Sequence, residues 1–222
     1  MLDMHCHVLY GVDDGAKTRE ESIDMLNAAK KCGIDKIVFT PHLYDVNQDL
    51  SKVLERYKEI IKIAGELGIK VKLGFEINWK VIDQVTPEQL EEYRIEDTDS
   101  ILLELPEKSL IREWQQIILR LARYHNIIIA HPERYLYVQN NLDMVRKFKE
   151  CGCEIAVDAS GMTRGIFGDE WKTANDLVKN GLADYIVSDA HKVEHYKYFQ
   201  KQSSKIKKLT NNAALYDEGL WQ

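Results

Sequence analysis

The stretch MHCH at residues 4–7, followed by the turn GVDDG at residues 11–15, is where the fold of this chain can first be read. The apolar residues before His5 predict a short strand at the start of the chain. Side chains two positions apart in a strand face the same side, so His5 and His7 would point together. Two imidazoles on one face form half of a metal site. An isolated pair of this kind is more often structural, so this interpretation depends on the rest of the chain.

Composition sets the class of protein. The chain has 222 residues, of which 45% are hydrophobic and 30% charged, and its net charge is -6. These values are typical of a soluble globular protein, and we expect a single domain over residues 1–222. The acidic balance argues against a nucleic-acid partner, because phosphate backbones require clustered Lys and Arg. Apolar runs of membrane length are absent from the sequence, so we expect no membrane insertion.

The four cysteines have no CxxC spacing and resemble reduced thiols, which predicts a cytoplasmic location. A cysteine phosphatase needs an arginine six positions after its nucleophile. The residues at those positions are Val12, Val38, Val157 and Ala159. A serine hydrolase of the GxSxG type is excluded because that motif is absent from the sequence.

Further short apolar runs predict buried strands at residues 36–40, 69–77, 101–105, 127–130, 154–158 and 185–188. Amphipathic segments that end near a glycine separate several of these runs and predict helices. Strands that alternate with helices indicate a parallel sheet covered on both faces. The chain has no GxGxxG after its first strand, which leaves a dinucleotide-binding fold without support.

Most of these predicted strands carry a histidine or a carboxylate at or near the carboxyl end. The residues concerned are His5, His7, His42, Glu76, Glu104, His131, Asp189 and His191. An open sheet would spread such residues along a line, whereas a parallel barrel gathers them on one rim, where active sites form. The pattern therefore favours a barrel.

Imidazoles mixed with carboxylates suit Mn, Fe or Zn rather than a soft thiolate site. The set is larger than one ion can use, which predicts two or three ions that share carboxylates. Adjacent divalent ions about 3.5–4 Å apart typically clamp an in-line phosphoryl displacement. Any one of these residues could be structural, but their common position at strand ends favours a metal centre.

Seven short motifs occur in order along the chain: HxH at 5–7, GVDDGAKT at 11–18, TPH at 40–42, GFEI at 74–77, LLEL at 102–105, HPER at 131–134 and SDAH at 188–191. This ordered set resembles the PHP (polymerase and histidinol phosphatase) metallophosphoesterases. It is most similar to the bacterial manganese-dependent tyrosine phosphatases found with capsule and exopolysaccharide genes. The resemblance implies a distorted (β/α)7, TIM-like barrel with a trinuclear metal site.

The resemblance also implies roles for individual residues. It assigns the first ion to His5, His7, Glu76 and Asp189, the second to Glu76, Glu104 and His131, and the third to Asp14, His42 and His191. It selects Asp14 over Asp13, which could instead orient a histidine. It makes Arg134 the phosphate-binding arginine, so Arg134, Asp14 and His42 are the expected catalytic residues.

One departure from the family pattern concerns the residues that would bind the phosphate group. The resembling phosphatases often have a second arginine shortly after the SDxH motif, where this chain has Lys192, His195, Tyr196 and Lys197. A lysine can supply a point charge there, but not the two-pronged contact of a guanidinium.

The resulting expectation is a phosphomonoesterase that hydrolyses phosphotyrosine in proteins, with the phosphorylated tail of a bacterial tyrosine kinase as its implied partner. Two alternatives remain open at this point. One is a small-molecule phosphatase, such as a histidinol phosphatase, with the same fold and metals. The other is a metal-binding regulatory domain that has lost turnover, against which the full ligand set argues.

Overall fold

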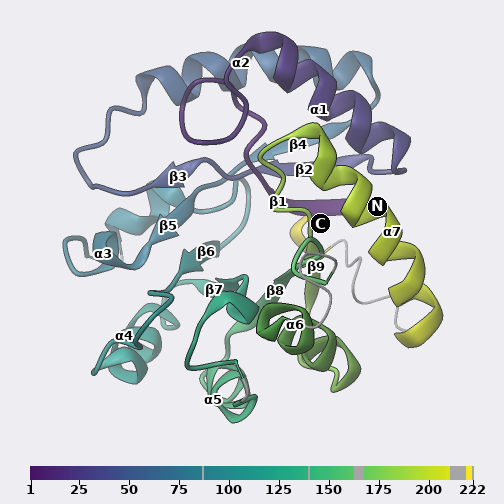
Figure 1. Ribbon diagram of the computed structural model, residues 1–222. Coiled ribbons are helices and arrows are strands. Elements are labelled where there is room, and N and C mark those ends of the chain that lie inside the picture. Colours follow the sequence, from purple (N-terminus) through teal and green to yellow (C-terminus); the bar gives the residue numbers. More distant parts are fainter. Residues whose placement is uncertain (87, 140, 163–167, 211–218, 222) are drawn as a thin grey trace.

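The computed structural model describes residues 1–86, 88–139, 141–162, 168–210 and 219–221. Its parallel strands alternate with helices, and the helices lie outside the strands (Figure 1). None of the helices in the described part of the chain is both long and apolar enough to cross a lipid bilayer.

The strands are β1 (Leu2–Cys6), β2 (Lys36–Phe39), β3 (His42–Leu43), β4 (Lys70–Leu73), β5 (Glu76–Asn78), β6 (Ser100–Glu104), β7 (Asn126–Ala130), β8 (Glu154–Asp158) and β9 (Tyr185–Val187). The helices are α1 (Arg19–Lys31), α2 (Ser51–Glu66), α3 (Trp79–Ile82), α4 (Trp114–Leu121), α5 (Asp143–Glu150), α6 (Asp169–Lys179) and α7 (Val193–Thr210). Short 3-10 helices cover Gln89–Tyr93, Pro132–Arg134 and Gly219–Trp221. Each strand prediction thus matches one or two observed strands.

The run predicted at 36–40 forms β2, and after a break the short strand β3 follows at His42–Leu43, beyond the predicted range. The run predicted at 69–77 is itself broken into β4 and β5. Both breaks lie at the same level, because Phe39 pairs with Leu73 below them and His42 with Glu76 above them. At the second break, a Cβ on Gly74 would lie only 2.9 Å from the side chain of Ile95, so only glycine fits there.

The strands form two parallel sheets, of order β1-β2-β4 and β3-β5-β6-β7-β8-β9. The sheets meet where β9 runs beside β1: the backbone N–H of Asp189 donates to the carbonyl of His5 at 3.0 Å, and that of His7 donates to Ala190 at 2.9 Å. The parallel α/β fold class is confirmed. The expected distortion of the barrel takes the form of two sheets in place of one continuous ladder.

A small apolar cluster lies between the inward faces of the strands and forms the floor of the site. Its members are Leu2, Met4, Val38, Ile95, Leu102, Ile128, Ala130, Ala156, Tyr185, Val187 and Leu220. Two positions beyond an inward residue, the chain turns polar: Glu104 follows Leu102, and Asp189 follows Val187. Alternate residues of a strand share a face, so these polar side chains lie on the same face as the apolar cluster, nearer the carboxyl ends of the strands.

In β1 the alternation is interrupted. Leu2 and Met4 belong to the inner cluster, but Cys6 packs in the larger outer core. The pairing of β1 with β2 shifts register between Asp3 and Cys6. Such an irregularity re-aims the side chains that follow it. It explains why Met4 and the next residue, His5, both point toward the interior that the strands enclose.

Candidate metal centre

Three groups of His, Asp and Glu side chains, found in the described part of the chain, have ligand atoms within 4.8 Å of one another. The first is His5, His7, Glu76 and Asp189; the second is His7, Asp14, His42 and His191; the third is His42, Glu76 and Glu104. His7, His42 and Glu76 each occur in two groups, so the three groups are continuous. The structure therefore brings the strand-end residues together on one rim.

The first group is buried. Nε2 of His5 lies 3.5 Å from Glu76 Oε1 and 3.3 Å from Asp189 Oδ1. Nε2 of His7 lies 3.3 Å from Glu76 Oε2 and 3.2 Å from the same oxygen of Asp189. All four side chains are at most 2% exposed. Two imidazoles from the end of β1 thus point at two carboxylates, one from β5 and one from the end of β9.

Several of these ligand atoms have no hydrogen-bond partner among the described residues. The buried atoms concerned are His5 Nε2, His7 Nε2, His42 Nδ1, Glu76 Oε2 and Asp189 Oδ1. An unpaired buried polar atom costs on the order of 1–3 kcal/mol, so such atoms rarely cluster without a reason. Divalent cations would satisfy these atoms, and the mixture of nitrogen and oxygen donors suits a transition metal. The residues present therefore fit a metal ion.

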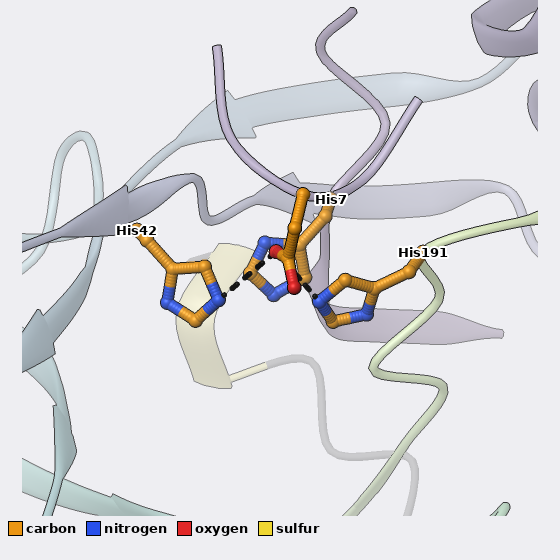
Figure 2. A group of neighbouring side chains, drawn as sticks. His7, His42 and His191 are labelled. Atoms are coloured by element: carbon orange, nitrogen blue, oxygen red, sulfur yellow. Dashed lines mark ion pairs between the residues drawn. The ribbon is translucent and has the colours of Figure 1, made fainter. Parts of the chain in front are cut away.

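The second group lies at the open end of the site. His42 Nε2 and His191 Nε2 lie 3.4 and 3.2 Å from Asp14 Oδ1, and the two histidines lie on either side of His7 (Figure 2). The Asp14 side chain is 66% exposed, whereas that of His42 is 9% exposed. His42 Nδ1 also lies 3.0 Å from Glu76 Oε2, which connects the rim to the buried group.

His131 and Glu104 are placed differently from the expectation. His131 is outside the three groups, but its Nε2 makes a 2.6 Å hydrogen bond with Glu76 Oε1. Glu104 joins His42 and Glu76, and its Oε2 accepts a hydrogen bond from Asn78 at 2.9 Å. Nine expected ligands thus lie in or against one cluster, and their division among individual ions stays a prediction.

The two turn aspartates have separate roles. Asp13 Oδ2 lies 2.8 Å from His7 Nδ1, and Asp13 Oδ1 accepts the backbone N–H of Gly15 at 2.9 Å. Asp13 therefore orients His7 from behind, while Asp14 faces His42 and His191. This geometry supports Asp14 rather than Asp13 as the candidate ligand, as the resemblance implies.

A second orienting group, Thr40, is missing from the sequence-based prediction. Its Oγ1 lies 2.6 Å from His5 Nδ1, so it fixes the ring that presents Nε2 to the carboxylates. The only available signal was the position of Thr40 at a strand end, directly before Pro41-His42. A threonine in such a place is common without any function, which is why it went unrecognised.

Asp189 and His131 have backbone conformations that non-glycine residues rarely adopt, with φ of 40° and 32°. Each costs on the order of 1–3 kcal/mol and persists only where the surroundings impose it. For Asp189 the restraint comes from Asp3, whose oxygens accept hydrogen bonds from the Ser188 N–H at 2.9 Å and the Ser188 hydroxyl at 2.6 Å. The sequence-based prediction did not single out Asp3 or Ser188. An acidic residue within a strand is usually assigned to the solvent-exposed face, so the sequence gives no sign of this role.

Two carboxylates of the site, Glu76 and Asp14, are held ionised. Burial alone would raise the pKa of Glu76, but the charges and hydrogen bonds of His5, His131 and His42 outweigh it and hold that pKa well below the usual range. A hydrogen bond with His42, reinforced by the charge of His191, lowers the pKa of Asp14. Ionised carboxylates beside imidazoles are the state that a metal ion requires.

Arg134 reaches the site from the turn after β7. Its Nη2 donates to Asp158 Oδ2 at 2.6 Å and also to Asp189 Oδ2. The Arg134 side chain is 25% exposed and lines two clefts, of about 720 and 550 Å³. The guanidinium is thus adjacent to the first group and accessible from outside.

The larger cleft also contains two lysines. Lys17 and Lys192 line it together with Arg134, Asp14 and His191, whereas Lys197 is not among its lining residues. Of the two lysines considered as substitutes for a second arginine, Lys192 is therefore the one that faces the site.

Glu133 is a buried acid that the sequence-based prediction did not single out. Its Oε1 accepts the backbone N–H of Asp158 at 3.1 Å, and its Oε2 has no hydrogen-bond partner within the part of the chain that the structure describes. Burial, together with the nearby charge of Asp158, raises its pKa from 4.5 to about 8. Glu133 is therefore protonated at neutral pH and adds no negative charge beside Arg134.

Comparison with known proteins reveals close relatives. A family model described as capsular polysaccharide synthesis, CpsB/CapC, matches residues 1–215. The putative tyrosine-protein phosphatase CapC of Staphylococcus aureus is 31% identical over 98% of this chain and 86% of its own length. Tyrosine-protein phosphatase YwqE of Bacillus subtilis is 33% identical over 87% of this chain and 78% of its own length.

The fold is shared with solved structures of the same kind. A chain from the crystal structures of Bacillus subtilis YwqE and Streptococcus pneumoniae CpsB, described as unique metal-dependent tyrosine phosphatases, superposes with a TM-score of 0.83 at 27% identity. The match covers 97% of this chain and 90% of the other.

Proposed function

The chain belongs to the CpsB/CapC family of capsular polysaccharide synthesis, and we propose that it is a metal-dependent tyrosine-protein phosphatase that hydrolyses phosphotyrosine in proteins. The observation that carries this proposal is the cluster of unpaired buried ligand atoms beside an arginine-bearing cleft. Metal ligands alone would suit many hydrolases. The adjacent guanidinium adds the specific complement of a phosphate group.

The proposed ligands are His5, His7, Asp14, His42, Glu76, Glu104, His131, Asp189 and His191. They would hold two or three divalent ions, with Mn as the first choice and Fe or Zn as alternatives. When bound, such ions supply an activated water and neutralise charge on the phosphoryl oxygens.

Within this proposal the chain itself positions the substrate. Arg134 binds two phosphoryl oxygens in a fork, and its bonds to Asp158 and Asp189 hold the guanidinium at the rim. Lys192, which lines the same cleft, adds a second positive charge in place of an arginine. The leaving phenolate has a pKa of about 10 as free phenol, so it needs less help from a general acid than an alkoxide.

The proposed substrate is the phosphotyrosine tail of a bacterial tyrosine kinase that acts in capsule or exopolysaccharide synthesis. This follows from the family to which the chain belongs. We place the protein in the cytoplasm, because its four cysteines are unpaired in the structure, as is typical of a reducing compartment.

The test compares hydrolysis of a phosphotyrosine peptide with that of histidinol phosphate, before and after chelation. We expect efficient hydrolysis of the peptide, its loss on chelation, and better recovery with Mn than with Mg, which prefers all-oxygen ligands. A Glu76→Gln variant controls for contaminating phosphatases, because Glu76 contacts both buried and rim ligands. Preference for histidinol phosphate would favour the small-molecule alternative, and full activity without metal would refute the mechanism.

A further inference from the structure

Tyr44 places an aromatic ring beside the rim group. Its ring is stacked on that of His42, with centroids 4.7 Å apart and an interplanar angle of 21°. Even so, 52% of the residue remains exposed. His42 contacts Asp14 through Nε2, so the Tyr44 ring extends the surface that begins at the metal centre. A large apolar ring exposed at this position is available to contact a ligand.

The position of Tyr44 is fixed by the loop that follows β3. Gln48 accepts the backbone N–H of Tyr44 through Oε1 at 3.1 Å and donates from Nε2 to the carbonyl of His42 at 2.9 Å. The two hydrogen bonds clamp the backbone on either side of Leu43. The ring is therefore preorganised, which lowers the entropic cost of using it to bind a ligand.

The rim has two chemically different sides. His42 and His191 lie on either side of His7 (Figure 2), and each contacts Asp14 Oδ1 through its Nε2. The side of His191 leads into the cleft lined by Lys192 and Arg134. The side of His42 leads to the exposed ring of Tyr44. A phosphate ester of a phenol has the matching form: a dianion at one end and an apolar ring at the other.

We propose that Tyr44 binds the aryl ring of the phosphorylated substrate and so sets a preference for aryl over alkyl phosphate esters. This inference rests on the proposed phosphatase function and adds a specificity-determining residue to it. Aromatic rings pair favourably in offset or edge-to-face arrangements. The alkyl group of a phosphoserine offers much less surface for such contact.

The test measures binding of two non-hydrolysable ligands to the Mn-loaded protein by calorimetry. We expect the wild type to bind phenylphosphonate more tightly than methylphosphonate. Tyr44→Ala should weaken phenylphosphonate binding by roughly five- to tenfold and leave methylphosphonate within about twofold. Tyr44→Phe should behave as wild type. Tyr124→Ala, which removes an equally exposed tyrosine (51%) from the turn after α4, should change neither affinity.

Equal weakening of both ligands by Tyr44→Ala would overturn the inference, because it would mean that Tyr44 acts through His42 and the metals. Unchanged phenylphosphonate binding would overturn it as well. Hydrolysis of a phosphotyrosine peptide by the wild type tests the underlying function separately. An inactive wild type that still shows Tyr44-dependent selectivity for the phenyl ligand would refute the phosphatase proposal and support the aryl-binding role.

Discussion

Arg134 joins the buried ligands to the substrate cleft, since the same guanidinium nitrogen contacts Asp158 and Asp189 while the side chain remains a quarter exposed. Replacing it by alanine should lower kcat/KM on a phosphotyrosine peptide by about 10²–10³, because a preorganised charge on the phosphoryl oxygens is lost. Arg134→Lys should recover only part of the activity, since a point charge replaces a fork. Steady-state kinetics, with metal content measured on each preparation, checks the expectation.

The alanine variant also leaves the buried Asp158 without its cation. The double variant Arg134→Ala, Asp158→Asn removes that unpaired charge and so serves as a control for stability. If the phosphate clamp is correct, the double variant should fold better than Arg134→Ala and remain as inactive. Near-normal turnover by metal-replete Arg134→Ala would remove Arg134 from the site.

Glu133 should make stability depend on pH. Its folded pKa of about 8 exceeds its usual 4.5, so between these values the folded protein retains a proton that the unfolded chain releases. The contribution of Glu133 to the free energy of unfolding should therefore be greatest below about pH 4.5 and fall as pH rises toward 8. Glu133→Gln, which keeps an oxygen for the Asp158 N–H, should remove this dependence, worth roughly 2–4 kcal/mol at pH 8.

Urea unfolding of the chelated protein at pH 5 and pH 8 measures this effect. Glu66→Gln, at an exposed position in α2, is the control for removal of a surface carboxyl. Parallel pH profiles for wild type and Glu133→Gln would show that Glu133 is not the responsible group.

At the scale of elements, the turn between β1 and α1 leaves no room for a side chain at Gly15. A Cβ on Gly15 would lie 2.1 Å from the carbonyl oxygen and 2.5 Å from the Cβ of His7. Gly15→Ala should therefore displace the turn that carries Asp13 and Asp14, lower stability by about 1–3 kcal/mol and reduce metal binding. Metal analysis and urea unfolding measure both effects.

The control for this substitution is another glycine. Gly65 lies in α2, and a Cβ there would meet no atom within 4 Å. Gly65→Ala should leave metal content unchanged and raise the free energy of unfolding by about 0.5–1 kcal/mol, because alanine loses less backbone entropy in a helix. A wild-type metal content in Gly15→Ala would contradict the role assigned to the turn.

For the whole molecule, the candidate metal centre connects distant parts of the chain, since its proposed ligands extend from β1 to His191, just before α7. Metal that binds only the folded state stabilises it by mass action. At a free concentration about 100 times the dissociation constant, the gain is about 2.7 kcal/mol, or roughly 5–10 °C in Tm for a chain of this size. Thermal melts of chelated and Mn-loaded protein should show this difference. The same melt on Glu76→Gln, which lacks a shared ligand, should show a much smaller one.

The sequence alone determined the alternation of strands and helices and the set of polar residues at strand ends. Both are short-range properties: a buried strand needs a run of apolar residues, and a helix needs its cap and its apolar stripe. The inference that His5, Glu104 and Asp189 lie on one rim also followed, because the carboxyl ends of parallel strands share one end of a barrel.

Only the tertiary structure decided how those residues pair. Asp13 supports His7 while Asp14 faces His42, and Arg134 binds Asp158 and Asp189. These partners are separated along the chain by as many as 55 residues, so strand register and backbone bulges set their distances. Neighbouring aspartates are equivalent in the sequence. They differ only in the direction in which the folded backbone points each carboxylate.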